Sequence, residues 1–345
     1  MPVSYTTSTA TLSLASIGFV GTRLKRPECV LAHSSGLLIA PDWTDPGGVS
    51  LITPSGSVAR ILATRPDPGV DLPIRPNGIV LEAGGTILCT HLGATRGGVY
   101  RLYADGRCSV VTDRVESAPM PPANFVAVDP AGRLWITIST RRTPRADDYR
   151  PDAQSGFVAV HAHGKTRIVA DGLGYTNECL FSADGRRLYV VETFARRLTV
   201  FDVADDRLLN RRVHARFGSG DFPDGIAEAV DGSLFVTSLV SNRILRVFSD
   251  GRVERLLQDA NEAHLAEVER AFQSGLMGRP HLDRIQSTRL GSTSNIAFGG
   301  PSLQTAFLGC LLGDAIAKFR APVAGRALAH WDADLGALAK YLEAA

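Results

Sequence analysis

The sequence offers few features that would suggest a cysteine-based site or a binding surface for nucleic acid. Its five cysteines are widely spaced among 345 residues and form no CxxC pair. A thiolate zinc site and a disulfide framework therefore have no support, and we expect buried free thiols. Lys plus Arg (37) nearly balance Asp plus Glu (35). Without a basic run or an aromatic-basic stripe, we expect no nucleic-acid partner.

Long hydrophobic runs are also missing. The longest apolar stretches fall far short of the ~20 residues that a membrane span needs, so we expect no membrane association. The first residues, MPVSYTTSTATLSLASIGFVG, contain no Lys or Arg. We expect a strand there rather than a signal peptide. Together with the free thiols, this favours a cytoplasmic protein.

Glycine and proline, by contrast, are abundant and punctuate short apolar runs, which is typical of β-structure (Gly 34, Pro 19). Six segments share one pattern, in which a polar residue precedes an apolar strand, a turn and a second apolar strand. They are ECVLAHSSGLLIAPD from Glu28, NGIVLEAGGTILCT from Asn77, NFVAVDPAGRLWITIS from Asn124, NECLFSADGRRLYVVE from Asn177, DGIAEAVDGSLFVTS from Asp224 and NIAFGGPSLQTAFLGC from Asn295.

Four of the five steps between these segments are close to the length of one four-stranded propeller blade. In several copies a second hairpin follows, such as GGVYRLYADGRCSVV, so each repeat predicts four strands. The chain is therefore predicted to be all-β, a six-bladed β-propeller forming one domain over residues 1–345. Residues 15–25 are expected to close the ring, with an insertion at about 259–290 and a short C-terminal helix.

The polar residue that opens each repeat should lie where the inner strands meet at one mouth of the central channel. These ring positions are Glu28, Asn77, Asn124, Asn177, Asp224 and Asn295 or its neighbour Ser294. Carboxylates and amides supply only oxygen donors, which a hard cation such as calcium prefers. The alternative is that an Asn or Asp before Gly, as at Asn77 and Asp224, only supports a turn.

Taken together, these blade motifs, from RPECV to SNIAFGGPSLQTAFLGC, resemble the senescence marker protein/gluconolactonase (regucalcin-like) family, related to diisopropyl fluorophosphatase. The resemblance implies a single divalent ion, with calcium favoured and zinc, manganese and magnesium as alternatives. Matched by motif, its ligands fall on Glu28, Asn124, Asn177 and Asp224. Asn77 and Asn295 then belong to the ring but not to the ligand set.

Two positions depart from the family pattern. Where sugar-lactonase members often carry an Arg that holds substrate hydroxyls, this chain has Pro122, and Phe125 replaces an Asp that often follows the Asn. Both changes make the rim less polar and favour a more apolar lactone or ester. We expect Asn77, Trp43, His91 and Phe125 at the substrate pocket, with the insertion and the loop 140–155 as a lid.

The resemblance implies a metal-dependent hydrolase that opens a lactone or related ester of a small-molecule substrate. Asp224 is the expected general base, with a nucleophilic role as the alternative. A phosphotriester or fluorophosphate hydrolase and a non-catalytic calcium-binding propeller are the rival functions. A lyase or isomerase on the same scaffold also remains open, because a fold does not fix a reaction.

Overall fold

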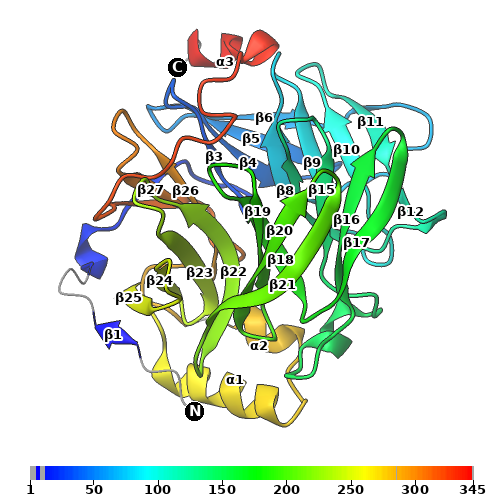
Figure 1. Cartoon of the computed structure of the whole chain (residues 1–345). Helices are drawn as coiled ribbons and strands as arrows, with labels where there is room; N and C mark the ends of the chain where they lie inside the picture. Colours follow the sequence, from blue (N-terminus) through cyan, green and yellow to red (C-terminus); the bar gives the residue numbers. More distant parts are fainter. Residues whose placement is uncertain (1–4, 8–11, 285, 344–345) are drawn as a thin grey trace.

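The computed structural model describes residues 5–7, 12–284 and 286–343. In these residues the chain forms six sheets of at least four strands each, placed around a central axis as the blades of a propeller (Figure 1). Their strands pair antiparallel, except that the short strands at two outer edges pair in parallel. The predicted all-β fold, a six-bladed β-propeller, is confirmed. Within each blade the strands follow one another in sequence from the inside outward, apart from short strands that join the outer edges.

The first three blades contain residues of the N-terminal half. The first blade consists of β3 (Leu31–Ala32), β4 (Leu38–Asp42), β5 (Gly48–Ile52) and β6 (Val58–Leu62). The second consists of β8 (Pro76–Leu81), β9 (Ile87–His91), β10 (Val99–Leu102) and β11 (Arg107–Thr112), extended by β7 (Arg65–Pro66). The third consists of β14 (Ala123–Val128), β15 (Leu134–Ile138), β16 (Gly156–Ala162) and β17 (Lys165–Leu173). A small hairpin of β12 (Arg114–Val115) and β13 (Ala118–Pro119) lies between the second and third blades in sequence.

The remaining three blades complete the ring. The fourth blade consists of β18 (Thr176–Phe181), β19 (Arg187–Glu192), β20 (Arg197–Ala204) and β21 (Arg207–Arg216). The fifth consists of β22 (Asp221–Glu228), β23 (Leu234–Val240), β24 (Arg243–Val247) and β25 (Val253–Leu257), extended by β1 (Thr6–Thr7). The sixth consists of β26 (Thr293–Gly299), β27 (Thr305–Cys310), β28 (Ile316–Arg320) and β2 (Gly18–Val20).

The core lies between neighbouring blades, because each sheet packs both of its faces against other sheets. Strands β15 and β23 are therefore buried along their whole length, whereas the outer strand β21 is mostly exposed. Trp135 of the third blade, for example, packs in one cluster with Val190 and Phe201 of the fourth. All five cysteines are free and buried, as expected.

The N-terminal segment closes the ring. Strand β2 pairs antiparallel with β28, so the last blade takes its outermost strand from the beginning of the chain. This confirms the expected closure, which leaves the circle without an open junction between first and last blade. Part of the segment read as a strand, residues 1–4 and 8–11, lies outside the described residues.

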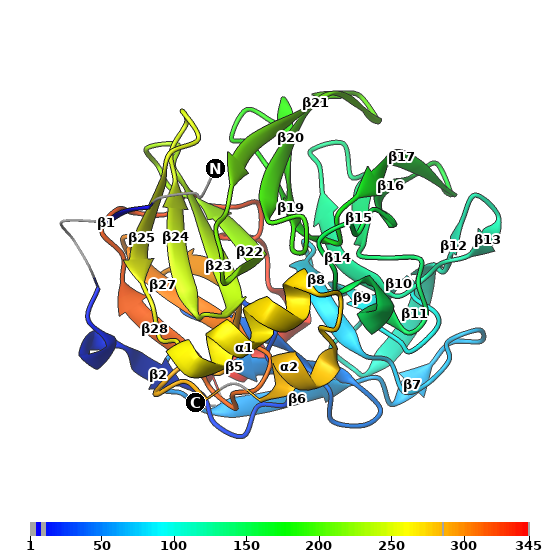
Figure 2. The same cartoon turned by 90° about the horizontal axis from the view of Figure 1, so that it is seen from below.

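Two segments outside the blade repeat gather at one end of the propeller. They contain η2 (Arg145–Asp148), in the connection from β15 to β16, and α1 (Glu262–Gln273) with α2 (Arg279–Asp283), in the insertion. Figures 1 and 2 both show α1 and α2 across this end. Helix α1 packs through Leu265, Val268 and Phe272. We call these two segments, 140–155 and 258–292, the lid.

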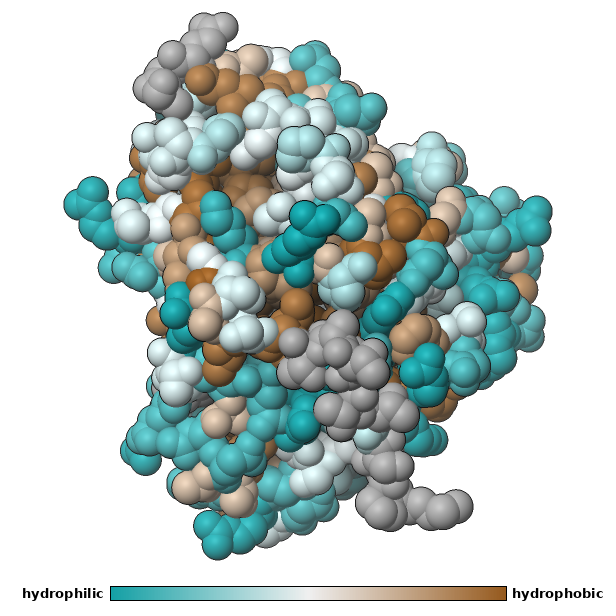
Figure 3. Space-filling model, turned by 90° about the vertical axis from the view of Figure 1, so that its left-hand side faces the viewer, coloured by the Kyte–Doolittle hydropathy of each residue, from teal (hydrophilic) through white to brown (hydrophobic). Residues whose placement is uncertain are grey.

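Short helices flank the propeller at both ends of the chain. They are η1 (Leu14–Ser16), η3 (Gly336–Leu338) and α3 (Lys340–Glu343). Leu335 and Leu338 pack into the core of the first two blades. On the side that carries the N-terminal segment, apolar residues are visible in hollows between polar ones (Figure 3). Within the described ranges, no helix combines the length and the apolar character needed to cross a bilayer.

Candidate metal centre and active site

The first strand of a blade loses its register at the ring position. In five blades the pairing between the first and second strands is interrupted there. The interruptions lie between Pro76 and Ile79 in β8, Ala123 and Phe125 in β14, Thr176 and Cys179 in β18, Pro223 and Ile226 in β22, and Thr293 and Asn295 in β26. Such β-bulges leave a residue outside the ladder and re-aim its side chain, and they are common next to active sites.

Glu28 is positioned differently from the other ring residues. Strand β3 begins only at Leu31, so Glu28 precedes the ladder of its blade. The segment is held by the sixth blade instead: Ser294 Oγ donates to the Glu28 carbonyl (2.7 Å) and Val30 N donates to Asn295 Oδ1 (2.9 Å). Residues Ser294 and Asn295 thus fix the backbone that carries Glu28.

The two glycines that follow ring residues do not form turns. Gly78 and Gly225 lie inside strands without a positive φ. A Cβ at Gly78 would be 2.7 Å from Phe125 Cα, and one at Gly225 would be 2.5 Å from Asn295 Cα. The first strand of the next blade comes too close for any side chain, so the turn explanation for Asn77 and Asp224 is wrong.

Four ring residues line a single small cavity, about 30 Å³ in volume, whose wall also includes residues of the lid. They are Glu28, Asn124, Asn177 and Asp224, with exposed fractions of 8%, 2%, 5% and 2%. These are the four residues for which the sequence predicts a ligand role. The structure brings them together, although they are spread over nearly 200 positions of the chain.

Hydroxyl groups orient the two amides. Asn124 Nδ2 donates to Ser139 Oγ (3.1 Å), and Asn177 Nδ2 donates to Thr193 Oγ1 (3.2 Å). Each NH₂ group is held by a residue just past the end of the neighbouring strand. The Asn177 side-chain oxygen is therefore left for the cavity, and the Asn124 side-chain oxygen accepts only a long contact from Asn77 Nδ2 (3.5 Å). Two neutral oxygen acceptors therefore lie beside the two carboxylates.

Asp224 has no side-chain hydrogen bond to any part of the chain that the structure describes, although it is almost fully buried. Burial, and next the nearby Glu28 and Glu178 carboxylates, raise the pKa of Asp224 well above its usual range. Glu28 is paired with Arg26, whose Nε lies 2.8 Å from Glu28 Oε2. A buried carboxylate without donors is costly unless a cation compensates it.

Glu178, which the sequence reasoning did not single out, lies among the inner strands. Its carboxyl oxygens accept from Ile226 N (3.0 Å) and Asn295 Nδ2 (2.7 Å), so it connects the first strands of the last three blades. Burial raises the pKa of Glu178 to about 8. Its position directly after Asn177 was the only signal in the sequence. Since both oxygens already accept hydrogen bonds, we assign it a structural role.

Trp43 and His91, expected at the substrate pocket, are not among the residues that line this cavity. Trp43 lies behind Arg26, whose guanidinium carbon is 4.4 Å from the indole centroid, and its Nε1 donates to Pro76 O (2.7 Å). His91 Nδ1 accepts from Arg75 N (2.8 Å). Burial, and next the positive charge of Arg75, lower the pKa of His91 to about 4. Trp43 therefore supports the cavity wall from outside, through Arg26.

Asn77 and Phe125 also lie outside the lining. Asn77 Nδ2 donates to the Asn124 carbonyl (3.0 Å), while its Oδ1 is buried without a partner among the described residues. It therefore supports the backbone of a ring residue in the next blade. Phe125 is half-buried and packs between blades, against Gly78. Its apolar ring faces the core, so replacing the family's Asp there does not change the cavity wall.

The lid supplies a large part of the cavity wall. Arg145 and Tyr149 come from the β15–β16 connection, and Arg279 and Leu282 come from the insertion. The expectation that both segments cover the channel agrees with this placement, but the individual residues were missed. The remaining lining is mostly apolar or aromatic: Leu92, Tyr175, Phe194, Leu239 and Leu311, with Arg26 and Thr193.

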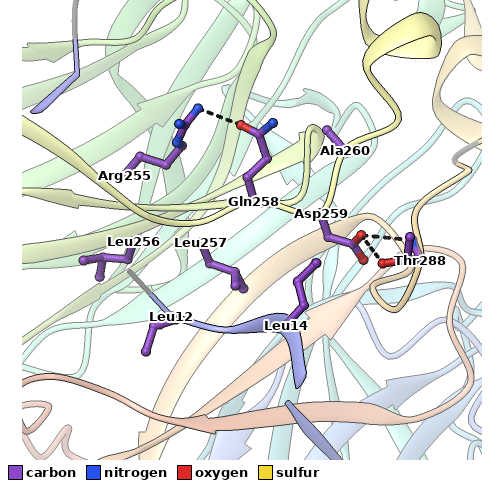
Figure 4. Close-up of a pocket in the computed structure, with 9 residues that line it drawn as sticks. All are labelled: Leu12, Leu14, Arg255, Leu256, Leu257, Gln258, Asp259, Ala260 and Thr288. Atoms are coloured by element: carbon purple, nitrogen blue, oxygen red, sulfur yellow. Dashed lines mark hydrogen bonds between the residues drawn. The ribbon is translucent and has the colours of Figure 1, made fainter. Parts of the chain in front are cut away.

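A separate hollow lies between the N-terminal segment and the outer edge of the fifth blade (Figure 4). Leu12, Leu14 and Leu257 face it, together with Asp259. The Asp259 carboxylate already accepts hydrogen bonds from the segment Thr288 to Leu290, which ties the end of the insertion to its start. No ring residue reaches this hollow, so the cavity at the lid remains the candidate active site.

The sequence places the chain in a known family. A family model described as "SMP-30/Gluconolactonase/LRE-like region" matches residues 17–260, more than half of the chain. The chain belongs to this family. The matched region contains all four predicted ligand residues, and it ends before most of the insertion.

Solved structures of related proteins have the same fold. A gluconolactonase from Xanthomonas campestris is 20% identical, with 93% of this chain and 97% of that chain covered and a TM-score of 0.64. A calcium-binding protein, regucalcin, from Agrobacterium tumefaciens is 15% identical, with 92% and 98% covered and a TM-score of 0.59. A virginiamycin B lyase from Staphylococcus aureus is 14% identical, with 88% and 98% covered and a TM-score of 0.55. Because the same fold occurs in a lyase, the site must decide the reaction.

Proposed function

We propose that this chain is a metal-dependent hydrolase that opens a lactone or a related ester. The observation that carries the proposal is the buried Asp224 carboxylate, which lines a cavity with Glu28 and two oriented amides and has no hydrogen-bond donor in the described structure. The family membership and the likeness to a gluconolactonase support the lactone as substrate class.

The donor set fits one hard divalent cation, and we propose calcium. Glu28 and Asp224 supply two negative charges, and Asn124 and Asn177 supply neutral oxygens, which is the ligand chemistry that calcium prefers. Within the described ranges no group of three or more His, Cys, Asp and Glu side chains is placed to share an ion. Any metal site here must therefore include the amides. The likeness to a calcium-binding regucalcin supports the choice of ion, with zinc, manganese and magnesium as alternatives.

The chain's own residues would then carry the proton transfers. The ion, when bound, polarises the ester carbonyl. Asp224 accepts a proton from the attacking water while the water oxygen bonds to the carbonyl carbon. The ester C–O bond then breaks, and the departing alkoxide takes the proton from Asp224, so one water is added in total. In the alternative, Asp224 attacks the carbonyl carbon itself, and the ester C–O bond breaks to give an anhydride and an alkoxide. Water then hydrolyses the anhydride, which releases Asp224 and supplies the proton that the alkoxide takes up.

The lid excludes bulk water from this step. Tyr149 packs against Phe194 (ring centroids 4.6 Å apart) and against Tyr175 (5.5 Å), so the cavity wall on this side is a continuous aromatic surface. A low-dielectric wall strengthens the electrostatic interactions of the carboxylates and arginines inside it. Small substrates with an apolar part fit such a wall better than fully hydroxylated sugars.

The test is acid release from a panel of sugar, aliphatic and aromatic lactones, measured by pH indicator before and after removal of metal with EDTA. We expect turnover of at least one lactone, its loss on chelation and its return with added calcium. Turnover that persists in fully metal-free protein would contradict the metal dependence. Calcium binding without turnover across the panel would indicate a non-catalytic propeller, and turnover confined to an added phosphotriester would indicate the rival hydrolase.

The five buried free thiols favour a reducing compartment, and we propose the cytoplasm. The charge balance gives no support for a nucleic-acid partner, and we propose a small-molecule substrate as the ligand of the cavity.

A further inference from the structure

The connection from β15 to β16 contains four arginines that differ in their partners. Three pair with a carboxylate: Arg141 with Asp171 (2.8 Å), Arg142 with Asp148 (3.2 Å) and Arg150 with Asp152 (2.5 Å). The fourth, Arg145, has no carboxylate within ion-pair distance in the described structure, and it is the one that lines the cavity.

The other arginines of the cavity wall are also paired. Arg26 binds Glu28 (2.8 Å), and Arg279 binds Asp283 (2.8 Å). Arg145 donates one hydrogen bond, from Nη2 to Ser139 Oγ (3.1 Å), and its guanidinium carbon lies 5.5 Å from the Tyr175 ring centroid. Its Nε is buried and has no acceptor among the described residues. A buried donor without a partner is a destabilising feature that a ligand oxygen would remove.

Ser139 places this guanidinium beside the proposed ion site. The same hydroxyl oxygen that accepts from Arg145 also accepts from Asn124 Nδ2 (3.1 Å). Only one oxygen atom therefore separates Arg145 from an amide that we propose as a ligand. Arg145 and Asn124 therefore line the same cavity and share one hydroxyl partner.

The charges of the cavity also favour an anionic ligand. Glu28 and Asp224 together match the charge of one divalent ion, and Arg26 is already paired with Glu28. Arg145 is then the lining arginine whose charge has no carboxylate partner in the described structure. Part of the surrounding wall is apolar, through Leu282 and Phe194 among others, and this part strengthens the attraction between a cation and an anionic ligand. A planar guanidinium matches the two coplanar oxygens of a carboxylate.

We infer that the substrate is an anionic lactone or ester that carries a carboxylate near the scissile bond, and that Arg145 binds this carboxylate. This inference rests on the proposed hydrolase function and names its substrate class. Arg145 is then a specificity-determining residue supplied by the lid, in a chain that has Pro122 where sugar-lactonase relatives often have an arginine.

A matched pair of substrates tests the inference. The γ-lactone of α-hydroxyglutarate and γ-valerolactone carry a carboxylate and a methyl group, respectively, on the same ring carbon. We expect kcat/KM of the native protein to be about 30-fold or more higher for the carboxylate, the effect of one or two charge-assisted hydrogen bonds. R145Q should remove this preference, mainly through a higher KM, and change the rate on γ-valerolactone by less than about threefold.

Two variants serve as controls. R145K keeps the charge and should recover part of the preference. R150Q removes an arginine of the same loop that is exposed and paired with Asp152, and both substrates should behave as with the native protein. Calcium affinity, measured by calorimetry, should not fall in R145Q, because the change removes a positive charge near the proposed ion site. This separates loss of substrate binding from loss of the ion.

A second readout does not depend on turnover. The ring-opened product, α-hydroxyglutarate, should bind the calcium-loaded native protein about 10-fold or more tightly than it binds calcium-loaded R145Q. Equal binding to both proteins would overturn the inference, as would equal effects of R145Q on the two lactones. If neither lactone is turned over, the proposed hydrolase function fails for this class, and the binding comparison still decides whether Arg145 holds a carboxylate.

Discussion

The ring and the lid meet in one cavity, but they are built in different ways. The ring repeats one device in successive blades, a bulge at the first strand with a polar side chain re-aimed into the channel. The lid has no repeat, and it is fastened by individual contacts such as the Arg196–Glu269 pair (2.6 Å). The difference suggests that the ring determines which ion and reaction the site supports, whereas the lid determines which substrate it accepts.

Substitutions in the ring should reduce activity more than substitutions in the lid. Replacing Asp224 with Asn keeps the shape but removes the charge and the base, so we expect kcat to fall about 10³-fold. Lactone turnover in saturating calcium is the measurement. Asp250→Asn, an exposed change in the same blade, should leave kcat unchanged. A near-native rate in D224N with calcium bound would remove Asp224 from the mechanism.

The hydroxyls that orient the amides should matter less than the ligands themselves. Thr193→Val removes the acceptor that holds Asn177 Nδ2, so the amide is free to rotate, and we expect calcium affinity to fall about 10-fold, as for other residues that support metal ligands. Thr112→Val removes a hydroxyl from the outer strand β11 and is the matched control. Unchanged calcium affinity in T193V, measured by calorimetry, would show that Thr193 does not orient a ligand.

Loosening the lid should affect substrate binding and stability before it affects the ion. Arg196 binds Glu269 of α1 through two hydrogen bonds (2.9 and 2.6 Å) and lies over the Phe272 ring (4.2 Å). Glu269→Gln weakens this pair, and we expect a loss of about 2 kcal/mol in the free energy of unfolding, within the range for charge-assisted hydrogen bonds. Denaturant unfolding and KM are the measurements, and a fall in calcium affinity equal to that in T193V would contradict the separation of lid and ring.

The smallest expected effect is the loss of the Arg196–Glu269 contribution to stability in acid. Burial alone would raise the pKa of Glu269, but hydrogen bonds from Arg196 and Gln273 outweigh it and lower the pKa to about 2, from an ordinary value of 4.5. The contribution of this pair is therefore fully present above pH 4.5 and is lost as the pH falls from 4.5 towards 2. The difference in the free energy of unfolding between native protein and E269Q should be smaller at about pH 3 than at about pH 6. A constant difference would contradict the assignment.

The sequence alone determined the blades and the ring. Every blade must bury the same two faces, so the strand pattern and the polar residue at its start recur along the chain, and they can be recognised without knowing which blades touch. The recurrence placed Glu28, Asn124, Asn177 and Asp224 at one level of the channel, where the structure has them. The purpose of the glycine after Asn77 was not visible, because its close neighbour, Phe125, belongs to the next blade.

Only the tertiary structure decided the wall of the cavity. Arg145, Tyr149 and Arg279 belong to segments that occur once, so no repeat marks them, and the direction of their side chains depends on partners far away in sequence. The same reason explains why Trp43 supports Arg26 instead of facing the cavity. Repetition makes the shared part of a propeller predictable from its sequence. The contacts of the unique loops are decided only when folding brings these loops over the channel.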